Sequence, residues 1–204
     1  MGTEIELIVG LGNPGPEHLK DRHNAGFWFV DLLARTHGGT FRKDKKLHGE
    51  SAEITVAGRR IRLLKPMTYM NLSGRAVAAA VGYYKTPLER VLVAYDELDF
   101  PPGRVQLKFG GSSAGHRGVT DVIQAVGPSF WRLRFGVGHP GRGRRDQVVN
   151  HVLARATEEE EALIVDAIAH AARTLPVILE HGAERAKNEL HSRKLPPAEP
   201  AEER

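Results

Sequence analysis

His23 and Asp96 have the residue types and positions that acid–base chemistry needs. His23 lies at or just before the predicted start of the first helix, where the positive end of the helix dipole favours a neutral imidazole that can act as a base near pH 7. Asp96 directly follows an apolar strand predicted at residues 91–95. A base that is oriented by a carboxylate can activate water, so no serine or cysteine nucleophile is required. The alternative for His23 is a helix-capping or surface histidine.

Two asparagines, Asn13 and Asn71, could complete such a site. Each side chain offers both a donor and an acceptor, which is the equipment needed to hold a peptide amide and the attacked carbonyl group. The alternatives are that Asn13 belongs to a turn and that Asn71 caps a helix.

A metal site is the other use for the acidic residues at 96–99. Asp96, Glu97 and Asp99 could bind an ion together with His23 or His116. Adjacent carboxylates in an extended segment point to opposite sides, so no more than two of them can converge without rearrangement. We therefore expect no metal.

The loop at residues 10–24 must be placed by the elements on either side of it. The segment before it, residues 5–9, is short and β-branched and ends at a glycine, so it predicts a buried strand. The segment after it has apolar residues at helical spacing, namely Ala25, Trp28, Phe29, Leu32 and Leu33. The loop therefore lies at the carboxyl end of a strand, where open α/β sheets bind ligands.

The glycines of this loop also match the pattern of dinucleotide-binding folds, at Gly10, Gly12 and Gly15. Pro14 and Pro16 remove N–H donors that such a loop would present to a pyrophosphate. A dinucleotide-binding oxidoreductase is therefore a rival interpretation that the sequence does not favour.

The rest of the chain alternates strands and helices, with one hairpin inserted. Strands are predicted at 49–56, 60–65, 91–95, 104–109 and 131–138, and helices at 73–84, 119–126 and from 157 onward, with a kink or break at Pro176. This pattern predicts one α/β domain at residues 1–195, with a twisted, mostly parallel mixed sheet and helices on both faces. Residues 196–204 are expected to be a disordered tail.

The composition fits a cytoplasmic protein with an anionic partner. The chain has 204 residues, no cysteine and a formal net charge of +4. It shows no secretory signal and no apolar run near 18 residues, so we expect no membrane association. Residues 132–145 contain five arginines, no acid and several glycines, which indicates a mobile, positively charged loop, as a lid over an anion would be.

Several motifs in one order resemble bacterial peptidyl-tRNA hydrolases, the enzymes that cut the ester between a peptide and its tRNA. These motifs are GLGNPG at 10–15, RHNAG at 22–26, YMNLSG at 69–74, DELD at 96–99 with PPG at 101–103, GH at 115–116 and GVGHPG at 136–141. The resemblance covers residues 5 to about 192. It implies a metal-free enzyme without a cofactor, and we expect a monomer with no obligate protein partner.

The resemblance also implies roles for individual residues. It makes His23 the base, Asp96 its orienting acid, and Asn13 the residue that recognises the acylated amine. It places the contacts with peptidyl-tRNA at His18, Tyr69, Asn71, Lys108, His116, Arg117 and Arg134, with Lys108 and Arg134 on a phosphate. The family usually has tyrosine where this chain has His18, asparagine where it has Arg117, and often threonine where it has Asp21. These departures leave a catalytically altered, RNA-binding relative of the same fold as an alternative.

Overall fold

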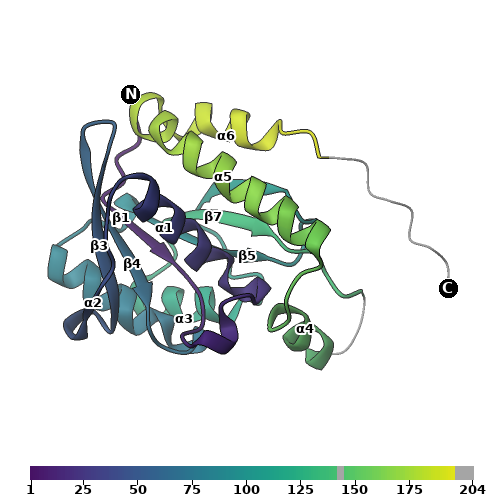
Figure 1. Cartoon of the computed structure of the whole chain (residues 1–204). Helices are drawn as coiled ribbons and strands as arrows, with labels where there is room; N and C mark the ends of the chain where they lie inside the picture. The colour runs from purple at the N-terminus through teal and green to yellow at the C-terminus, as the bar shows by residue number, and fades with distance from the viewer. Residues whose placement is uncertain (142–144, 196–204) are drawn as a thin grey trace.

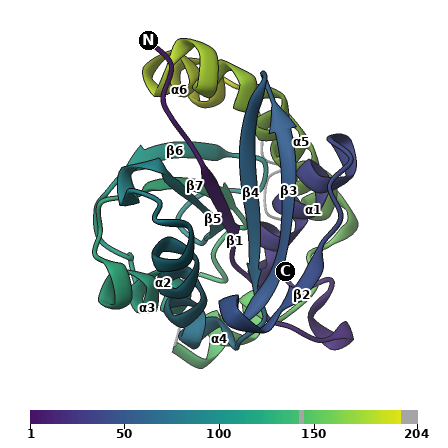
Figure 2. The same cartoon turned by 90° about the vertical axis from the view of Figure 1, so that its left-hand side faces the viewer.

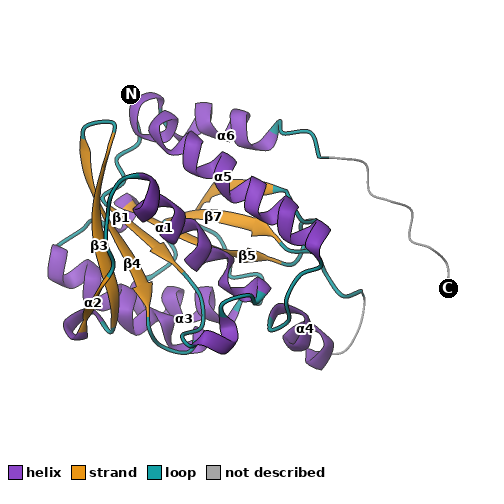
Figure 3. Cartoon of the chain, in the orientation of Figure 1, coloured by secondary structure: helices purple, strands orange, loops and turns teal. Residues whose placement is uncertain are grey.

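A seven-stranded sheet forms the centre of the computed structural model, which describes residues 1–141 and 145–195. The predicted tail at 196–204 lies outside the described residues. The strands, in the spatial order β2-β3-β4-β1-β5-β7-β6, are β1 (Leu7–Gly10), β2 (Arg42–Asp44), β3 (Gly49–Val56), β4 (Arg59–Pro66), β5 (Val91–Glu97), β6 (Val105–Phe109) and β7 (Trp131–Gly136). The helices are α1 (Ala25–Thr36), α2 (Ser73–Tyr84), α3 (Arg117–Val126), α4 (Arg145–Val152), α5 (Glu158–His181) and α6 (Ala183–His191), and short 3₁₀ turns precede several of them (Figure 3).

The sheet has a parallel centre and antiparallel edges. β4, β1, β5 and β7 run parallel to one another, whereas β2 with β3, β3 with β4, and β6 with β7 are antiparallel pairs. The predicted hairpin is confirmed as β3 and β4, and its turn places Ala57 and Gly58 at positive φ. The predicted α/β fold with a mixed sheet is thus confirmed, with the parallel pairing confined to the four central strands.

Helices cover both faces of this sheet (Figures 1 and 2). One core lies between the sheet and α1, α5 and α6, and a second core lies between the sheet and α2 and α3. Side chains along β1 alternate between the two cores, with Ile8 in the first and Leu7 and Val9 in the second. A strand that is buried on both faces needs apolar residues at every position, which explains the continuous apolar run in its sequence.

The glycines near the N-terminus allow the end of β1 to contact the start of α1. A Cβ atom at Gly10 would lie 2.2 Å from the carbonyl oxygen of Gly26, and one at Gly26 would lie 2.3 Å from that of Ala94. A Cβ atom at Gly12 would meet the ring of Phe27 at 2.6 Å. These glycines are therefore explained by close packing, and this packing brings the turn that carries His23 against the ends of β1 and β5.

One local expectation was wrong, and another was wrong in part. Asn71 does not cap α2, because a 3₁₀ turn (Met70–Leu72) precedes the helix and the carboxylate of Asp121 accepts from the Gly74 N–H instead, at 2.7 Å. Of the two outcomes expected at Pro176, a kink or a break, the break does not occur, since α5 continues to His181. The buried residues on either side of it, Leu175 and Ile178, pack in the first core, and this packing offsets the missing hydrogen bond.

The sequence also left three elements unassigned, β2, α4 and α6. The longest helix, α5, is long and apolar enough to cross a membrane by length and composition. It begins with four consecutive glutamates, and its apolar face packs on the sheet, so it serves here as a core helix.

Candidate active site

A cavity of about 270 Å³ opens at the carboxyl ends of β1 and β5. Its polar lining comes from residues far apart in the chain, namely Asn13, His23, Tyr69, Asn71, Asp96, Glu97, His116 and Arg117. Its apolar lining includes Met70, Leu98, Val148, Val149, Val152 and Leu153, of which the last four belong to α4 or directly follow it. The cavity therefore lies where the topology of an α/β sheet predicts a ligand site.

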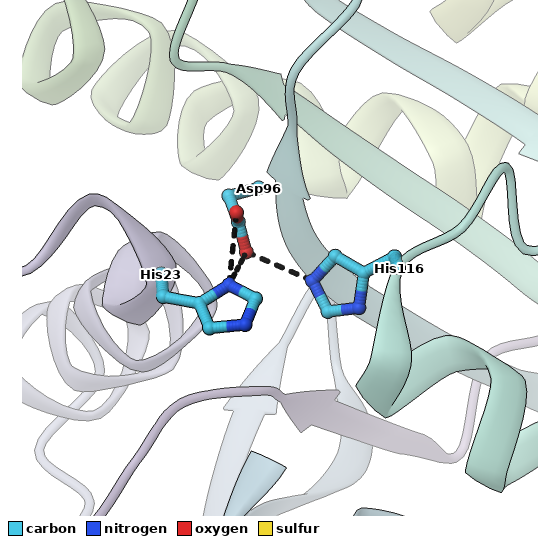
Figure 4. A group of neighbouring side chains, drawn as sticks. All are labelled: His23, Asp96 and His116. Carbon is cyan, nitrogen blue, oxygen red and sulfur yellow. Dashed lines mark hydrogen bonds and ion pairs between the residues drawn. The ribbon is translucent and has the colours of Figure 1, made fainter. Parts of the chain in front are cut away.

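His23 and Asp96 form a buried pair in this cavity (Figure 4). The Nδ1 atom of His23 lies 2.9 and 3.0 Å from the two carboxylate oxygens of Asp96. Because a carboxylate only accepts, Nδ1 carries the proton and Nε2 of the neutral ring keeps its lone pair. No described residue forms a hydrogen bond to Nε2, so this lone pair is available to a ligand in the cavity.

His116 is a second partner of Asp96. Its Nε2 atom lies 2.9 Å from Oδ1 of Asp96, and its Nδ1 accepts the N–H of Val119 at 3.2 Å as the cap of α3. The His116 ring also lies between the rings of His23 and Tyr95, with centroid distances of 4.9 and 5.0 Å. The structure shows that His116 also holds the carboxylate that orients His23, while its expected contact with the tRNA stays a prediction.

The charges and hydrogen bonds of this cluster raise the pKa of His23 and lower that of Asp96. Burial alone would lower the pKa of His23, but the charge and hydrogen bond of Asp96 outweigh burial and raise it above its usual value. Burial alone would raise the pKa of Asp96, but the two imidazoles hold it well below its usual range. Asp96 therefore stays ionised, and His23 is a stronger base than an isolated histidine.

The same three side chains, His23, Asp96 and His116, are close enough to be considered as metal ligands, with candidate ligand atoms within 4.8 Å of one another. The hydrogen bond from Val119 argues against this use. It requires a lone pair on Nδ1 of His116, so the proton of the neutral ring lies on Nε2, the atom that faces Asp96. A protonated nitrogen cannot coordinate a metal ion, and the cluster is satisfied by hydrogen bonds instead.

Asn13 is held in one orientation by three hydrogen bonds. Its N–H and carbonyl groups bond to the side chain of Asn24 at 2.9 and 3.0 Å. Its own Oδ1 accepts the N–H of Met70 at 2.8 Å. Because the atom that accepts from Met70 must be the amide oxygen, the Nδ2 group points elsewhere, and it bonds to no described residue. Asn13 can therefore offer Nδ2 as a donor to a ligand in the cavity.

Asp96 and Glu97 lie on opposite faces of the sheet, because successive side chains along a strand alternate between the two faces. Asp96 lies on the α1 side of β5, whereas Glu97 pairs with Arg134 on the other side, at 3.0 Å. Lys108 and Arg134 line a second cavity of about 60 Å³, together with Tyr95, Glu97, Ser112, Ala114 and Arg132. Lys108 is exposed and forms no ion pair with a described residue, so it is the more available cation of the two.

The remaining predicted residues are placed in two ways. Tyr69, Asn71 and Arg117 are exposed at the rim of the larger cavity. His18 lines neither cavity, and its Nδ1 lies 2.6 Å from the carboxylate of Asp21, so two departures from the family pattern form a pair.

The predicted positive loop at 132–145 is only partly described. Arg132 belongs to β7 and is buried, and its guanidinium donates to the carbonyl oxygens of Gly111 and Ser112. This arginine is therefore a structural cross-link and not part of a mobile lid. Residues 142–144 lie outside the described residues.

Sequence reasoning missed Asn24 and the apolar wall formed by α4. Asn24 follows His23 directly in the RHNAG motif, so its position beside the base was a usable signal. The wall had no comparable signal, because the residues of α4 show no apolar period long enough to predict a helix.

Nearly the whole chain matches proteins of one family. A family model described as peptidyl-tRNA hydrolase matches residues 7–198. The peptidyl-tRNA hydrolase of Photorhabdus laumondii is 45% identical over 192 residues, which are 93% of this chain and 97% of that protein. The peptidyl-tRNA hydrolase of Yersinia enterocolitica is 47% identical over 192 residues, with 93% and 96% covered.

The fold matches as well. A crystal structure of the peptidyl-tRNA hydrolase of Acinetobacter baumannii superposes with a TM-score of 0.91 at 44% sequence identity, and the match covers 95% of this chain and 98% of that one. The agreement of sequence and fold over nearly the full length does not favour the dinucleotide-binding or the altered RNA-binding alternative. The chain belongs to the peptidyl-tRNA hydrolase family.

Proposed function

We propose that this chain hydrolyses the ester between an N-blocked peptide and the 3′-terminal ribose of a tRNA, with His23 as the general base. The observation that carries this proposal is the pair of free groups in the cavity, the Nε2 lone pair of His23 and the Nδ2 donor of Asn13. One can accept a proton from water, and the other can donate to a carbonyl oxygen as it gains negative charge.

In this mechanism Nε2 of His23 takes a proton from a water molecule as its oxygen attacks the ester carbonyl. Asp96 stabilises the imidazolium that forms, and His116 holds Asp96 in place. When the tetrahedral intermediate collapses, the bond to the ribose oxygen breaks and the imidazolium returns its proton to that oxygen. The products are a peptide with a free carboxylate and a tRNA with a free ribose hydroxyl.

The two cavities suggest where each part of the substrate binds. The acyl group would lie along the apolar wall formed by Val148, Val149, Val152 and Leu153, because this wall adjoins His23. Tyr69, Asn71 and Arg117 would contact the tRNA terminus from the rim. Lys108 and Arg134 would hold a tRNA phosphate through charge-assisted bonds. We further propose that the enzyme acts in the cytoplasm as a monomer without a cofactor.

A substrate pair tests the proposal. Purified protein is incubated with N-acetyl-aminoacyl-tRNA or with free aminoacyl-tRNA, and released amino acid is measured. Release from the blocked substrate alone is expected, because a protonated amine would be buried against the donor of Asn13. Equal release from both, or from neither, would contradict the proposal.

A further inference from the structure

The buried guanidinium of Arg22 connects the turn that carries His23 to the apolar wall of the cavity. Arg22 directly precedes His23, and its side chain is 8% exposed. One of its terminal nitrogens donates to the carboxylate of Glu160 at 2.7 Å. The other lies 3.1 and 3.3 Å from the carbonyl oxygens of His151 and Ala154.

These carbonyl groups belong to the end of α4 and to the segment after it. The last turn of a helix has unpaired carbonyl groups and carries partial negative charge, so a cation is favourable there. The backbone N–H of Arg22 also donates to the carbonyl of Ala154, at 3.1 Å. The segment that carries the base and the end of α4 are thus joined by main-chain and side-chain bonds.

Apolar burial alone holds α4 weakly. Among the described side chains of α4, Val152 alone is buried. The side chain of His151 makes a second polar contact, in which its ring lies 3.2 and 3.0 Å from the carbonyl oxygens of Val137 and Gly138. The place of the apolar wall therefore depends on polar contacts, of which those of Arg22 are nearest to the base in the chain.

The chemistry of Arg22 supports a specific function over general stability. Its Nε atom is buried and has no hydrogen-bond partner among the residues that the structure describes, a state that is unfavourable for a donor. A lysine would avoid this unpaired Nε, but one ammonium cannot reproduce the planar fork that reaches a carboxylate and two carbonyl groups together.

We infer that Arg22 is a positioning residue that sets the distance between His23 and the α4 wall, and so determines how well the enzyme uses substrates with a large apolar residue at the ester. This inference rests on the proposed function. Loss of the fork would let α4 move away from the base, which would weaken contacts with the acyl side chain while leaving the tRNA contacts in place.

The test compares one tRNA body carrying either N-acetyl-leucine or N-acetylglycine. In Arg22→Lys, kcat/KM for the leucine ester should fall about tenfold, the size of effect that a hydrophobic contact gives, and for the glycine ester less than about threefold. The affinity for deacylated tRNA should change less than twofold. Arg90→Lys is the matched control, because both terminal nitrogens of Arg90 are also paired, with the carboxylates of Glu4 and Glu6, but at the opposite end of β5.

A double-mutant cycle with Val149→Ala sharpens the test. If Arg22 acts by placing the wall, the two substitutions together should lower leucine-ester kcat/KM by less than the product of their separate effects. Fully independent effects, or equal losses for both esters in Arg22→Lys, would overturn the inference.

If Arg22→Lys does not fold, Glu160→Gln serves in its place, since it removes the negative charge that Arg22 faces. It should lower the ratio of leucine-ester to glycine-ester kcat/KM by a smaller factor than Arg22→Lys would. No hydrolysis of either ester by the unmodified enzyme would instead refute the proposed function.

Discussion

Asp96 and Glu97 are neighbours in the chain, yet the two carboxylates lie in different electrostatic environments. Asp96 is buried between two imidazoles, one of which it orients toward the larger cavity. Glu97 faces the other side of β5 and pairs with the guanidinium of Arg134 beside the smaller, cationic cavity. The difference arises because successive side chains along a strand point to opposite faces of the sheet. Asp96 therefore pairs with His23 on one face, and Glu97 partly neutralises the positive charge of Arg134 on the other.

The largest expected effect comes from removing the base on the Asp96 side. His23→Ala should lower kcat by roughly 10² to 10⁴, the usual contribution of a positioned general base. Single-turnover hydrolysis of N-acetyl-aminoacyl-tRNA at saturating enzyme measures this directly. His18→Ala is the comparison variant, because His18 also bonds to an aspartate through Nδ1 but lies outside both cavities, and its kcat should stay within about threefold.

The next prediction compares the two carboxylates directly. Asp96→Asn should lower kcat by roughly 10²-fold, because an amide cannot accept from both His23 and His116 without placing one N–H group against another. Glu97→Gln should leave kcat within about threefold and change KM, since it alters charge at the smaller cavity. A large loss of kcat in Glu97→Gln with an intact fold would show that the two sides of β5 are not separate in function.

A third prediction addresses the cationic cavity itself. Lys108→Ala should flatten the slope of log K against log salt for tRNA binding by about 0.7 to 0.9, the value for one phosphate contact. Arg134→Ala should change the slope less, because its charge is already opposed by Glu97. Lys85→Ala, an exposed lysine just after α2, is the control. An unchanged slope in Lys108→Ala would mean that Lys108 touches no phosphate.

The smallest expected effect concerns the pH dependence set by Arg117. Burial lowers the pKa of His23, Asp96 and Asp21 raise it, and the positive charge of Arg117 lowers it. Removing that charge in Arg117→Asn should raise the pKa, so the acid limb of the kcat/KM profile should move to higher pH. At pH values above the acid limbs of the unmodified enzyme and of Arg117→Asn, the two kcat values should differ by less than about threefold. A limb that moves to lower pH would contradict this sign.

Asp21→Asn offers the opposite change and checks the same balance. It removes a negative charge that raises the pKa of His23, so its acid limb should move to lower pH. In the double variant with Arg117→Asn the two shifts should largely cancel. An NMR titration of the His23 ring protons would follow the pKa without relying on activity.

The order of residue types along the chain was enough to predict the α/β class, the hairpin and the dyad of His23 and Asp96. Strand and helix periods are local properties, and both residues directly follow or precede an element whose period is clear. The predicted start of the long helix near residue 157 is confirmed for the same reason, since Thr157 and Glu160 form a capping box that needs only these two residues.

The contacts that complete the site depend on tertiary structure. His116 reaches Asp96 because the end of β5 and the start of α3 meet, although 20 residues separate them in the chain. Met70 orients Asn13 across 57 residues of the chain, and Arg22 holds the end of α4 across more than 120 residues. Hydrogen bonds between distant segments leave no periodic trace in a sequence, so only the folded chain decides which donors and lone pairs remain free to react.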